Sequence, residues 1–397
     1  MRNHSFVLGS ARLGLNALII GLVLWGCSGP VSDPLSAGTS SFGEISGQIF
    51  AADDPNIQYW GRIDFSDPQK PRFSSAAIVI RARFQGTSIG VLLEDEHKWG
   101  SNRNYYDAII DDGAPLKFAA TGHSGTYPIQ TGLVDGEHTL TLVKRTESLI
   151  GYGRFLGLVI DGELLPPPAR PHRRIEIIGD SISAGGGIEA KNGSPQCQED
   201  GWGQPYNNAR LAFGPVLARA LGAEYQDQGY SGIGLLRNYE DGLPMPAIYD
   251  RTFLEDANSP RWDRSRFVPD VVVVALGTND FSPGSTPRPT MEVQRFAAAY
   301  IDFLTRLRAD YLDAHLVCVS SPMLSDGWPK PSDTSATDLR TALGLVVDHF
   351  AARGDHKIHK FLVTRVQGQG CGSHPDVAQQ AATATELRAF LAAILGW

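Results

Sequence analysis

Three consecutive prolines, Pro166 to Pro168, divide this chain of 397 residues into two stretches with different hydrophobic patterns. Proline has no amide donor, so the run stops any hydrogen-bonded ladder and forms a stiff, extended connector. Short runs that alternate apolar and polar residues precede the prolines. After them, apolar strands alternate with amphipathic helical stretches. The sequence therefore predicts two domains of different fold class, joined by a linker at residues 166–172.

The first stretch, residues 45–165, is predicted to be a β-sandwich. Turn residues, including three Asp-Gly pairs, separate its short runs, and no long helical pattern interrupts them. We expect each Asp-Gly pair to mark a tight hairpin, because such turns need positive φ angles. The strands are predicted at residues 76–84, 88–93, 106–110, 138–143 and 155–160.

The second stretch, residues 173–397, alternates short apolar strands with amphipathic helices. This alternation predicts a parallel sheet covered by helices on both faces, a three-layer α/β fold with its ligand chemistry at the carboxyl ends of the strands. The strands are predicted at residues 174–178, 224–228, 271–276, 316–320 and 358–363, and the helices at 207–221, 291–311, 338–352 and 376–395.

Residues 1–27 are predicted to be a lipoprotein signal peptide. Two arginines precede an apolar run, residues 13–25, that is too short for a comfortable membrane span. The run ends in Leu-Trp-Gly-Cys, which resembles a bacterial lipobox, so we expect lipidation of Cys27 and export to the outer membrane or cell surface. An ordinary signal peptide is the alternative. Residues 28–44, rich in Ser, Gly and Pro, are expected to form a flexible tether.

Charge and cysteine content narrow the classes of partner and compartment. The net charge of −8 and the absence of Lys and Arg clusters in the sequence argue against a nucleic-acid partner. Besides Cys27, the chain has Cys197, Cys318 and Cys371. We favour a disulfide between Cys197 and Cys371, since both lie in loops near the predicted active site, while three inert thiols remain the alternative.

Four polar or glycine-rich motifs follow predicted strands of the second domain. They contain Ser181, Gly232, Asn279 and His374. Each motif alone is also typical of an ordinary turn, a helix cap or a structural histidine. Because the carboxyl ends of parallel strands meet at one edge, we expect all four loops to converge there. A serine hydroxyl needs a nearby base and oxyanion donors to act as a nucleophile, and this set of residues can supply both.

The four motifs resemble the four blocks of SGNH (GDSL-type) hydrolases. From about residue 45 to residue 397, the chain is similar to carbohydrate esterase family two, in which an N-terminal β jelly roll precedes an SGNH domain of flavodoxin-like architecture. Segments outside the blocks, such as Lys144-Arg145-Thr146-Glu147, share this similarity.

The resemblance implies a role for each motif. Ser181 would be the nucleophile and His374 the general base. The main-chain amides of Ser181 and Gly232, with the side chain of Asn279, would form the oxyanion hole. The acidic residues Asp180 and Asp280 are expected to brace turns.

One position departs from the usual SGNH pattern. An Asp commonly stands three residues before the catalytic His, but Cys371 occupies that place here. Family-two esterases can use a main-chain carbonyl to hold the imidazole instead, and we adopt that interpretation. Asp376 is a weaker candidate, because it is expected to belong to the following helix.

Three other features are interpreted as structural. Ser88 lies in a Gly-x-Ser-x-Gly sequence, but a strand continues after it where a nucleophile elbow needs a helix. The pair His356 and His359 lacks neighbouring Cys or carboxylate ligands, so we predict no metal site. No phosphate loop or dinucleotide fingerprint occurs in a suitable context, and no cofactor is expected.

The predicted function is hydrolysis of O-acetyl groups from a polysaccharide or oligosaccharide. Trp328 and Trp202 are candidates for stacking on sugar rings, although core packing is an equally good explanation for either. A non-catalytic glycan-binding lipoprotein, an SGNH lipid esterase and a transacylase are the alternatives. Contact with a membrane is expected only through the lipid anchor.

Overall fold

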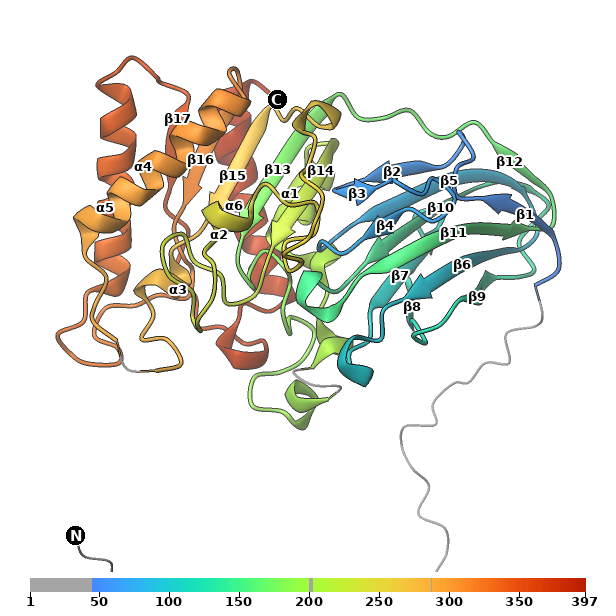
Figure 1. The fold of residues 1–397 in the computed structure, drawn as a ribbon, viewed down its shortest axis with the longest axis horizontal. Coiled ribbons are helices and arrows are strands. Elements are labelled where there is room, and N and C mark those ends of the chain that lie inside the picture. Colours follow the sequence, from blue (N-terminus) through green and yellow to red (C-terminus); the bar gives the residue numbers. More distant parts are fainter. Residues whose placement is uncertain (1–44, 200–202, 287) are drawn as a thin grey trace, which may run out of the picture. The chain divides into compact units, whose positions relative to one another are not determined.

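Two antiparallel sheets form the first folded region of the computed structural model, which describes residues 45–199, 203–286 and 288–397 (Figure 1). Their strands are β1 (Gln48–Ala51), β2 (Gln58–Trp60), β3 (Ile63–Asp64), β4 (Arg72–Phe73), β5 (Val79–Gly86), β6 (Ile89–Asp95), β7 (Tyr105–Ile110), β8 (Leu116–Ala119), β9 (Gly125–Gln130), β10 (Gly136–Lys144), β11 (Gly153–Ile160) and β12 (Glu163–Leu165). One sheet runs β3-β4-β11-β6-β9, with β1 beside β11. The other runs β12-β5-β10-β7-β8, with β2 beside β5.

The core of this β-sandwich follows from alternation along its strands. In β5, Ala82 and Phe84 are buried, while the residues between and after them are partly exposed. From the other sheet, Leu93 and Phe155 join the same apolar cluster. Burying one such large side chain stabilises the fold by about 1.5–3 kcal/mol. All five strands predicted in this region are present, as β5, β6, β7, β10 and β11.

The Asp-Gly pairs mark a hairpin at one place and not at two others. The first pair lies between the antiparallel neighbours β7 and β8, where the positive φ angles belong to Asp111 and Asp112. Asp135-Gly136 and Asp161-Gly162 lie where the chain crosses from one sheet to the other. The prediction of a hairpin was therefore wrong at these two pairs, because the strands on either side pair with other partners.

The second folded region contains a five-stranded sheet whose strand pairs are all parallel. Its strands are β13 (Arg173–Gly179), β14 (Ala223–Gly229), β15 (Val271–Ala275), β16 (His315–Val319) and β17 (Ile358–Phe361). The helices are α1 (Phe213–Ala220), α2 (Met245–Ile248), α3 (Thr278–Phe281), α4 (Val293–Asp310), α5 (Ser335–Ala351) and α6 (Val377–Leu395). The order β14-β13-β15-β16-β17 is the flavodoxin-like order.

Helices cover both faces of this sheet, as the sequence predicts (Figure 1). Ile178 and Val274 pack with α4 and α5 on one face. Ile177 and Val273 pack with α1 and α6 on the other. Such double coverage explains why β15 and β16 are nearly continuous apolar runs. Among the described helices, none is long and apolar enough to cross a bilayer.

The helix predicted at residues 207–221 begins only at Phe213, so its first part was predicted wrongly. The main-chain amides of this segment have partners elsewhere. Asn208 donates to the carbonyl of Gly185 at 2.9 Å, and Ala209 donates to the carbonyl of Arg145 at 2.8 Å. These long-range bonds replace helical bonds and tie the segment to the sandwich.

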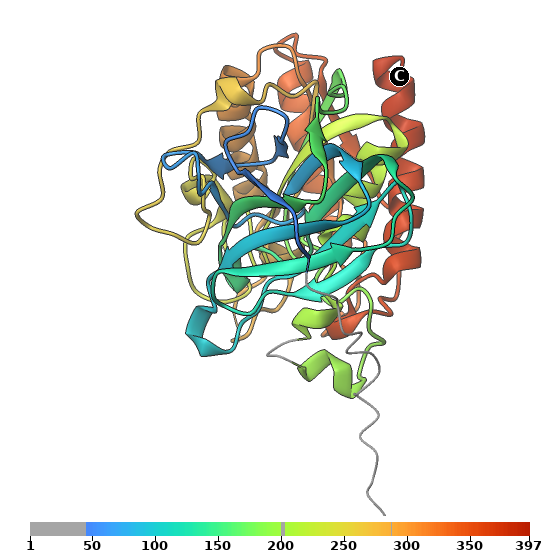
Figure 2. The ribbon, with the colours of Figure 1, turned by 90° about the vertical axis from the view of Figure 1, so that its right-hand side faces the viewer.

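The sandwich packs against the edge of the parallel sheet within one compact unit, Gly43–Trp397 (Figure 1), and it lies in front in the view of Figure 2. Trp60 of β2 belongs to the same apolar cluster as Tyr225 of β14, with ring centroids 6.0 Å apart. Arg62, which is 0% exposed, donates to Glu176 of β13 at 3.0 Å. Removing one partner of such a pair would leave a buried charge unpaired. The sandwich and the second folded region are therefore joined by an apolar contact and by a buried ion pair to which each region contributes one residue.

Candidate active site

Ser181 stands in a tight turn at the carboxyl end of β13. Asp180, which is 1% exposed, holds the turn: its carboxylate accepts the amide hydrogen of Ile182 at 2.9 Å, and its carbonyl accepts that of Ala184 at 3.0 Å. Burial raises the pKa of Asp180 to about 6, although the Ile182 hydrogen bond acts in the opposite direction. Ser181 itself is partly exposed, so its hydroxyl projects from a rigid support.

The structure brings Ser181 and His374 together. The Oγ–H of Ser181 donates to Nε2 of His374 at 2.6 Å. On the far side of the ring, Nδ1–H donates to the carbonyl oxygen of Cys371 at 2.7 Å. Since a carbonyl can only accept, this contact fixes the tautomer with its lone pair toward the serine. The carbonyl of Cys371 thus occupies the position where SGNH enzymes usually place an acid.

Asp376, the other acidic candidate, is engaged elsewhere. It is the N-cap of α6, where its carboxylate accepts the amide hydrogen of Gln379 at 2.9 Å. The side-chain oxygen of Gln379 accepts the amide hydrogen of Asp376 at 3.0 Å, which completes a capping box. This residue therefore caps the helix and does not support the imidazole.

Three hydrogen-bond donors lie on the loops around the serine. Within the described part of the chain, the main-chain amides of Ser181 and Gly232 donate to no protein acceptor. The side-chain amide of Asn279 donates one hydrogen to the carbonyl of Ile233 at 2.8 Å and keeps a second hydrogen available. Gly232 has φ of +75°, a conformation that favours glycine.

Hydrogen bonds between loops hold these donors near Ser181. The amide of Tyr230 donates to the carbonyl of Gly179 at 3.1 Å, which ties the Gly232 loop to the turn after β13. The Asn279 contact ties the loop after β15 to the same Gly232 loop. A Cβ at Gly186 would lie 3.7 Å from Cβ of Ser181 and 3.9 Å from Oγ of Ser231, so both loops border one glycine.

Asp280 braces the chain that follows Gly232. Its carboxylate, almost fully buried, accepts the amide hydrogens of Leu235, Leu236 and Arg237 at 2.9, 2.7 and 3.0 Å. Burial raises the pKa of Asp280, and these three hydrogen bonds lower it. A carboxylate so fully used has no free oxygen for chemistry, which matches the expected bracing role.

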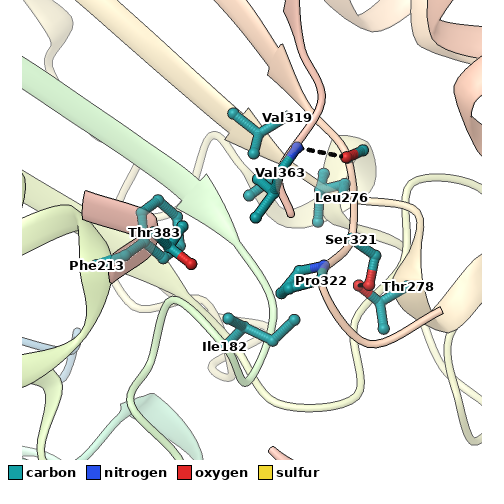
Figure 3. A pocket seen from close by; sticks show the side chains of 11 residues that line it. Ile182, Phe213, Leu276, Thr278, Val319, Ser321, Pro322, Val363 and Thr383 are labelled. Atoms are coloured by element: carbon teal, nitrogen blue, oxygen red, sulfur yellow. Dashed lines mark hydrogen bonds between the residues drawn. The ribbon is translucent and has the colours of Figure 1, made fainter. Parts of the chain in front are cut away.

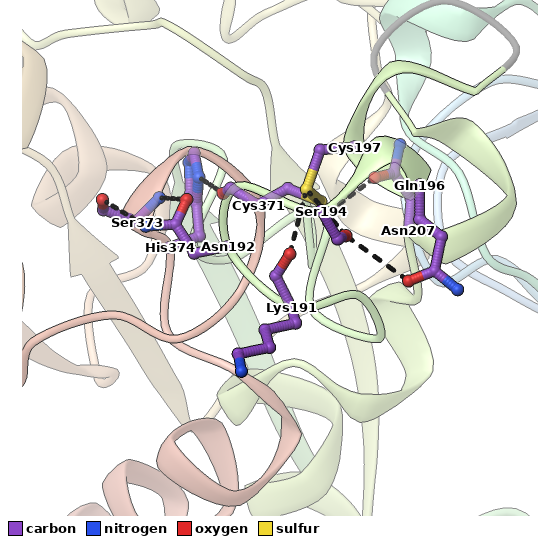
Figure 4. Close-up of a disulfide and its surroundings, with 10 residues drawn as sticks. Lys191, Asn192, Ser194, Gln196, Cys197, Asn207, Cys371, Ser373 and His374 are labelled. Atoms are coloured by element: carbon purple, nitrogen blue, oxygen red, sulfur yellow. Dashed lines mark hydrogen bonds between the residues drawn. A yellow bond between two sulfur atoms is a disulfide. The ribbon is translucent and has the colours of Figure 1, made fainter.

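A disulfide between Cys197 and Cys371, with Cα atoms 5.4 Å apart, clamps the histidine loop, as the sequence analysis favoured (Figure 4). Asn192 adds two contacts, because its side chain accepts from the amide of Ser373 at 3.2 Å and donates to the Ser373 hydroxyl at 3.1 Å. A Cβ at Gly187 would lie 2.5 Å from Cβ of Cys371, so the close approach requires glycine. The disulfide is thus formed by the same residue whose carbonyl accepts a hydrogen bond from the His374 ring.

A small apolar cavity lies behind the serine turn (Figure 3). Ile182, Phe213 and Val363 are among the residues that line it. Neither Ser181 nor His374 belongs to its lining, so this cavity is separate from the serine–histidine pair.

Among the described residues, the others singled out in the sequence make none of the contacts described above for the serine–histidine pair. Trp328, on the loop between β16 and α5, is 60% exposed, which suits a contact with a ligand better than core packing. Trp202 and Cys27 lie outside the described residues. Ser88 lies between β5 and β6, which belong to different sheets, and a strand follows it where a nucleophile elbow needs a helix. His359 pairs with His315, ring nitrogens 2.9 Å apart, and the described residues include no cluster of three metal-binding side chains.

One residue beside the site had no predicted role. Glu147, at the end of the Lys144-Arg145-Thr146-Glu147 segment, accepts the amide hydrogen of Ser231 at 2.6 Å. The sequence signal was a segment with three ionisable residues, Lys144, Arg145 and Glu147, at the end of a strand. Its meaning depends on a contact between domains that the local pattern does not reveal.

Comparison with known proteins gives the same division of the chain. Residues 59–168 match the family described as Carbohydrate esterase 2 N-terminal. Residues 177–386 match the GDSL-like Lipase/Acylhydrolase family. The second match alone covers more than half of the chain.

Relatives extend this finding. The cellulase/esterase CelE of Acetivibrio thermocellus is 33% identical over 350 residues, which are 87% of this chain and 40% of that protein. This chain therefore spans 40% of that relative's length. An acetylxylan esterase / glucomannan deacetylase of Cellvibrio japonicus is 27% identical, with 89% of this chain and 92% of that protein covered. A family two carbohydrate esterase from Clostridium thermocellum, solved in complex with cellohexaose, has a TM-score of 0.77 at 32% identity and covers 86% of this chain and 99% of that one.

The fold and the loops at its carboxyl edge define a GDSL-type esterase. Within that class, the matches over both domains show that the chain belongs to carbohydrate esterase family two.

Proposed function

We propose that this chain hydrolyses O-acetyl esters of polysaccharides or oligosaccharides, with Ser181 and His374 as a catalytic dyad. The observation that carries the proposal is the chain of hydrogen bonds from the Ser181 hydroxyl through the imidazole to the carbonyl of Cys371. This arrangement prepares the base in the tautomer that removes the serine proton. It needs no carboxylate, because the acceptor's main task is to orient the ring.

The reaction then follows two balanced steps. Ser181 attacks the acetyl carbonyl and passes its proton to His374, and the oxyanion is held by the amides of Ser181 and Gly232 and the side chain of Asn279. The imidazolium next protonates the departing sugar oxygen, leaving an acetyl-serine. In the second step, His374 takes a proton from water as the water attacks the acetyl-serine. The imidazolium then returns a proton to Oγ of Ser181 as the ester bond breaks, which frees the serine and releases acetic acid, which ionises to acetate.

The carbohydrate substrate is inferred from relatives. Those named acetylxylan esterase / glucomannan deacetylase align over 92% and 90% of their own length. The structure in complex with cellohexaose belongs to a homologous domain. Trp328 is exposed in the loop between β16 and α5, on the domain that carries Ser181. We propose that it contacts the sugar by stacking.

Acetate release tests the proposal. The purified chain is incubated with acetylated xylan, acetylated glucomannan, an aryl acetate and an aryl ester of a long acyl chain, and the free acid is measured. We expect acetate from both polysaccharides and from the aryl acetate. Sugar binding without acetate release would identify a glycan-binding protein. Preference for the long acyl chain would identify a lipid esterase, and acetylation of an added sugar would identify a transacylase.

The pH dependence of the rate is expected to follow His374. Burial lowers the pKa of its imidazole below the usual 6.5, although the hydrogen bond to Cys371 acts in the opposite direction. The base works only when neutral, so kcat/KM on the aryl acetate should fall as the pH drops through a value below 6.5. An acidic limb centred above 6.5 would contradict this assignment.

Removal of the disulfide is expected to cost stability more than turnover. The free energy of unfolding of the double variant Cys197→Ser/Cys371→Ser, measured by urea denaturation, should be about 2–5 kcal/mol lower than that of the wild type. Its kcat should stay within about tenfold of the wild type, since the carbonyl of residue 371 remains. A reductant should lower the melting temperature of the wild type and leave that of the variant unchanged. Equal responses would show that the two sulfurs are not bonded.

We also propose that Cys27 carries a lipid after export and that the preceding residues are removed. The support is the lipobox-like sequence Leu-Trp-Gly-Cys. Mass spectrometry of the mature N-terminus, compared with a Cys27→Ala variant, tests this. An unmodified N-terminus would leave an ordinary signal peptide as the explanation.

A further inference from the structure

Glu147 connects the β-sandwich to the loop that carries Gly232. The residue follows β10 and is 5% exposed. One carboxylate oxygen accepts the amide hydrogen of Ser231 at 2.6 Å, and the other accepts the hydroxyl hydrogen of the same residue. Hydrogen bonds to an ionised group are roughly twice as strong as neutral ones, so Ser231 is held firmly at two atoms.

The contact matters because Ser231 and Gly232 share a peptide unit. That unit carries the Gly232 amide assigned to the oxyanion. On its far side, the carbonyl of Gly232 accepts the amide hydrogen of Tyr239 at 2.7 Å. The residues on both sides of this peptide are thus held in place, which limits the directions that its N–H can take. Glycine's own conformational freedom at this position makes such restraint necessary.

The segment that presents Glu147 is itself rigid. Lys144, which is 1% exposed, donates to the carbonyls of Ser74, Thr146 and Glu147 at 2.9, 2.8 and 3.2 Å. The hydroxyl of Thr146 donates to Asn104 at 2.6 Å. A buried lysine that solvates its own segment's carbonyls fixes the backbone, so the carboxylate of Glu147 is preorganised before substrate arrives.

The next residue along the segment braces a second loop of the site. Arg145 donates to Asp107 at 2.7 Å and also contacts Glu189, which follows the serine turn. Its carbonyl accepts the amide hydrogen of Ala209 at 2.8 Å. Two residues of the sandwich, Arg145 and Glu147, therefore support two loops that flank Ser181.

We propose that Glu147 of the β-sandwich is a positioning residue, which sets the direction of the Gly232 amide and so completes the oxyanion hole of the other domain. This inference rests on the proposed esterase function. It gives the sandwich a role in turnover, distinct from any role in holding polysaccharide. Because the oxyanion forms only after attack, the contribution belongs to the transition state and not to substrate binding.

The test is steady-state kinetics of Glu147→Ala and Glu147→Gln on an aryl acetate. We expect Glu147→Ala to lower kcat by about 10- to 100-fold with KM unchanged within about twofold, since a small misplacement of a catalytic group has that cost. Glu147→Gln keeps an oxygen that can accept from the Ser231 amide, so it should restore most of the loss.

Glu255→Ala is the matched control. Glu255 is another largely buried carboxylate close to Glu147, and its side chain accepts from Ser74 at 3.3 Å; among the described residues, no hydrogen bond joins it to Ser231 or Gly232. Burial raises the pKa of both glutamates. We expect the control to lose stability in thermal melts but to keep kcat within about twofold.

Each outcome decides the matter. A kcat of Glu147→Ala within twofold of the wild type, or a loss that Glu255→Ala reproduces, would overturn the inference. Should Glu147→Ala fail to fold, Ser231→Ala removes the hydroxyl contact alone, and a severalfold loss of kcat is expected; an unchanged kcat would overturn the inference in that case too. A wild type that releases no acetate would instead refute the proposed function.

Discussion

Replacing Ser181 by alanine is expected to lower kcat on the aryl acetate by at least about 10⁴-fold. The variant loses the hydroxyl oxygen that is proposed to form the acetyl-enzyme, while the imidazole and the oxyanion donors remain. Because Ser181 is partly exposed and, within the described part of the chain, its hydroxyl bonds to His374 alone, removal should leave folding almost unchanged. Rates normalised to total protein concentration and melting curves measured on the same preparation separate the two effects.

Ser183→Ala is the control for this variant. Ser183 lies two residues away and is 0% exposed, and in the described part of the chain its hydroxyl has no partner. Loss of that hydroxyl should leave kcat within about twofold of the wild type. If Ser181→Ala kept the wild-type rate, the nucleophile would have to be another residue and the dyad assignment would fail.

Replacing Asn279 by alanine is expected to lower kcat by about 10²- to 10³-fold, the cost of one oxyanion donor. KM should change little, because the donated hydrogen bond strengthens only as charge develops on the carbonyl oxygen. The variant also loses the 2.8 Å contact with Ile233, so the free energy of unfolding should fall by about 1–3 kcal/mol. Kinetics and urea denaturation on the same preparation measure both changes.

Ser282→Ala provides the comparison for Asn279. Its hydroxyl donates to the carbonyl of Asn279 at 3.1 Å, so its removal disturbs the same short helix without removing a donor. We expect a kcat within about threefold of the wild type. Equal losses in the two variants would mean that Asn279 acts through the shape of the loop, and the oxyanion role would be withdrawn.

The fold was predictable where the hydrophobic pattern is long. Strand β5 and helices such as α4 have enough residues to show their period, and β15 is a continuous apolar run. The short strands β1 to β4, β8 and β12, with two to four residues each, were missed, as was the six-residue β9. Such short segments have no visible period, and pairing with distant strands defines them.

Some residues of the candidate site could likewise be predicted from the sequence, and others could not. Ser181, Gly232, Asn279 and His374 could be proposed because each follows a strand in a recognisable motif, and parallel topology sends strand ends to one edge. The role of Glu147 could not, since it depends on how the sandwich meets the other domain. Likewise, residues 207–212 were assigned to a helix because local propensity gave no sign of their bonds to Gly185 and Arg145.

The use of a backbone oxygen beside His374 has a consequence for residue 371. A peptide group offers the same acceptor whatever its side chain is, and it neither titrates nor carries a net charge. Cys371 can therefore serve two tasks at once. Its carbonyl oxygen orients the imidazole ring, and its sulfur links the histidine loop to Cys197. An aspartate at this position could hold the ring, but it could not form the disulfide.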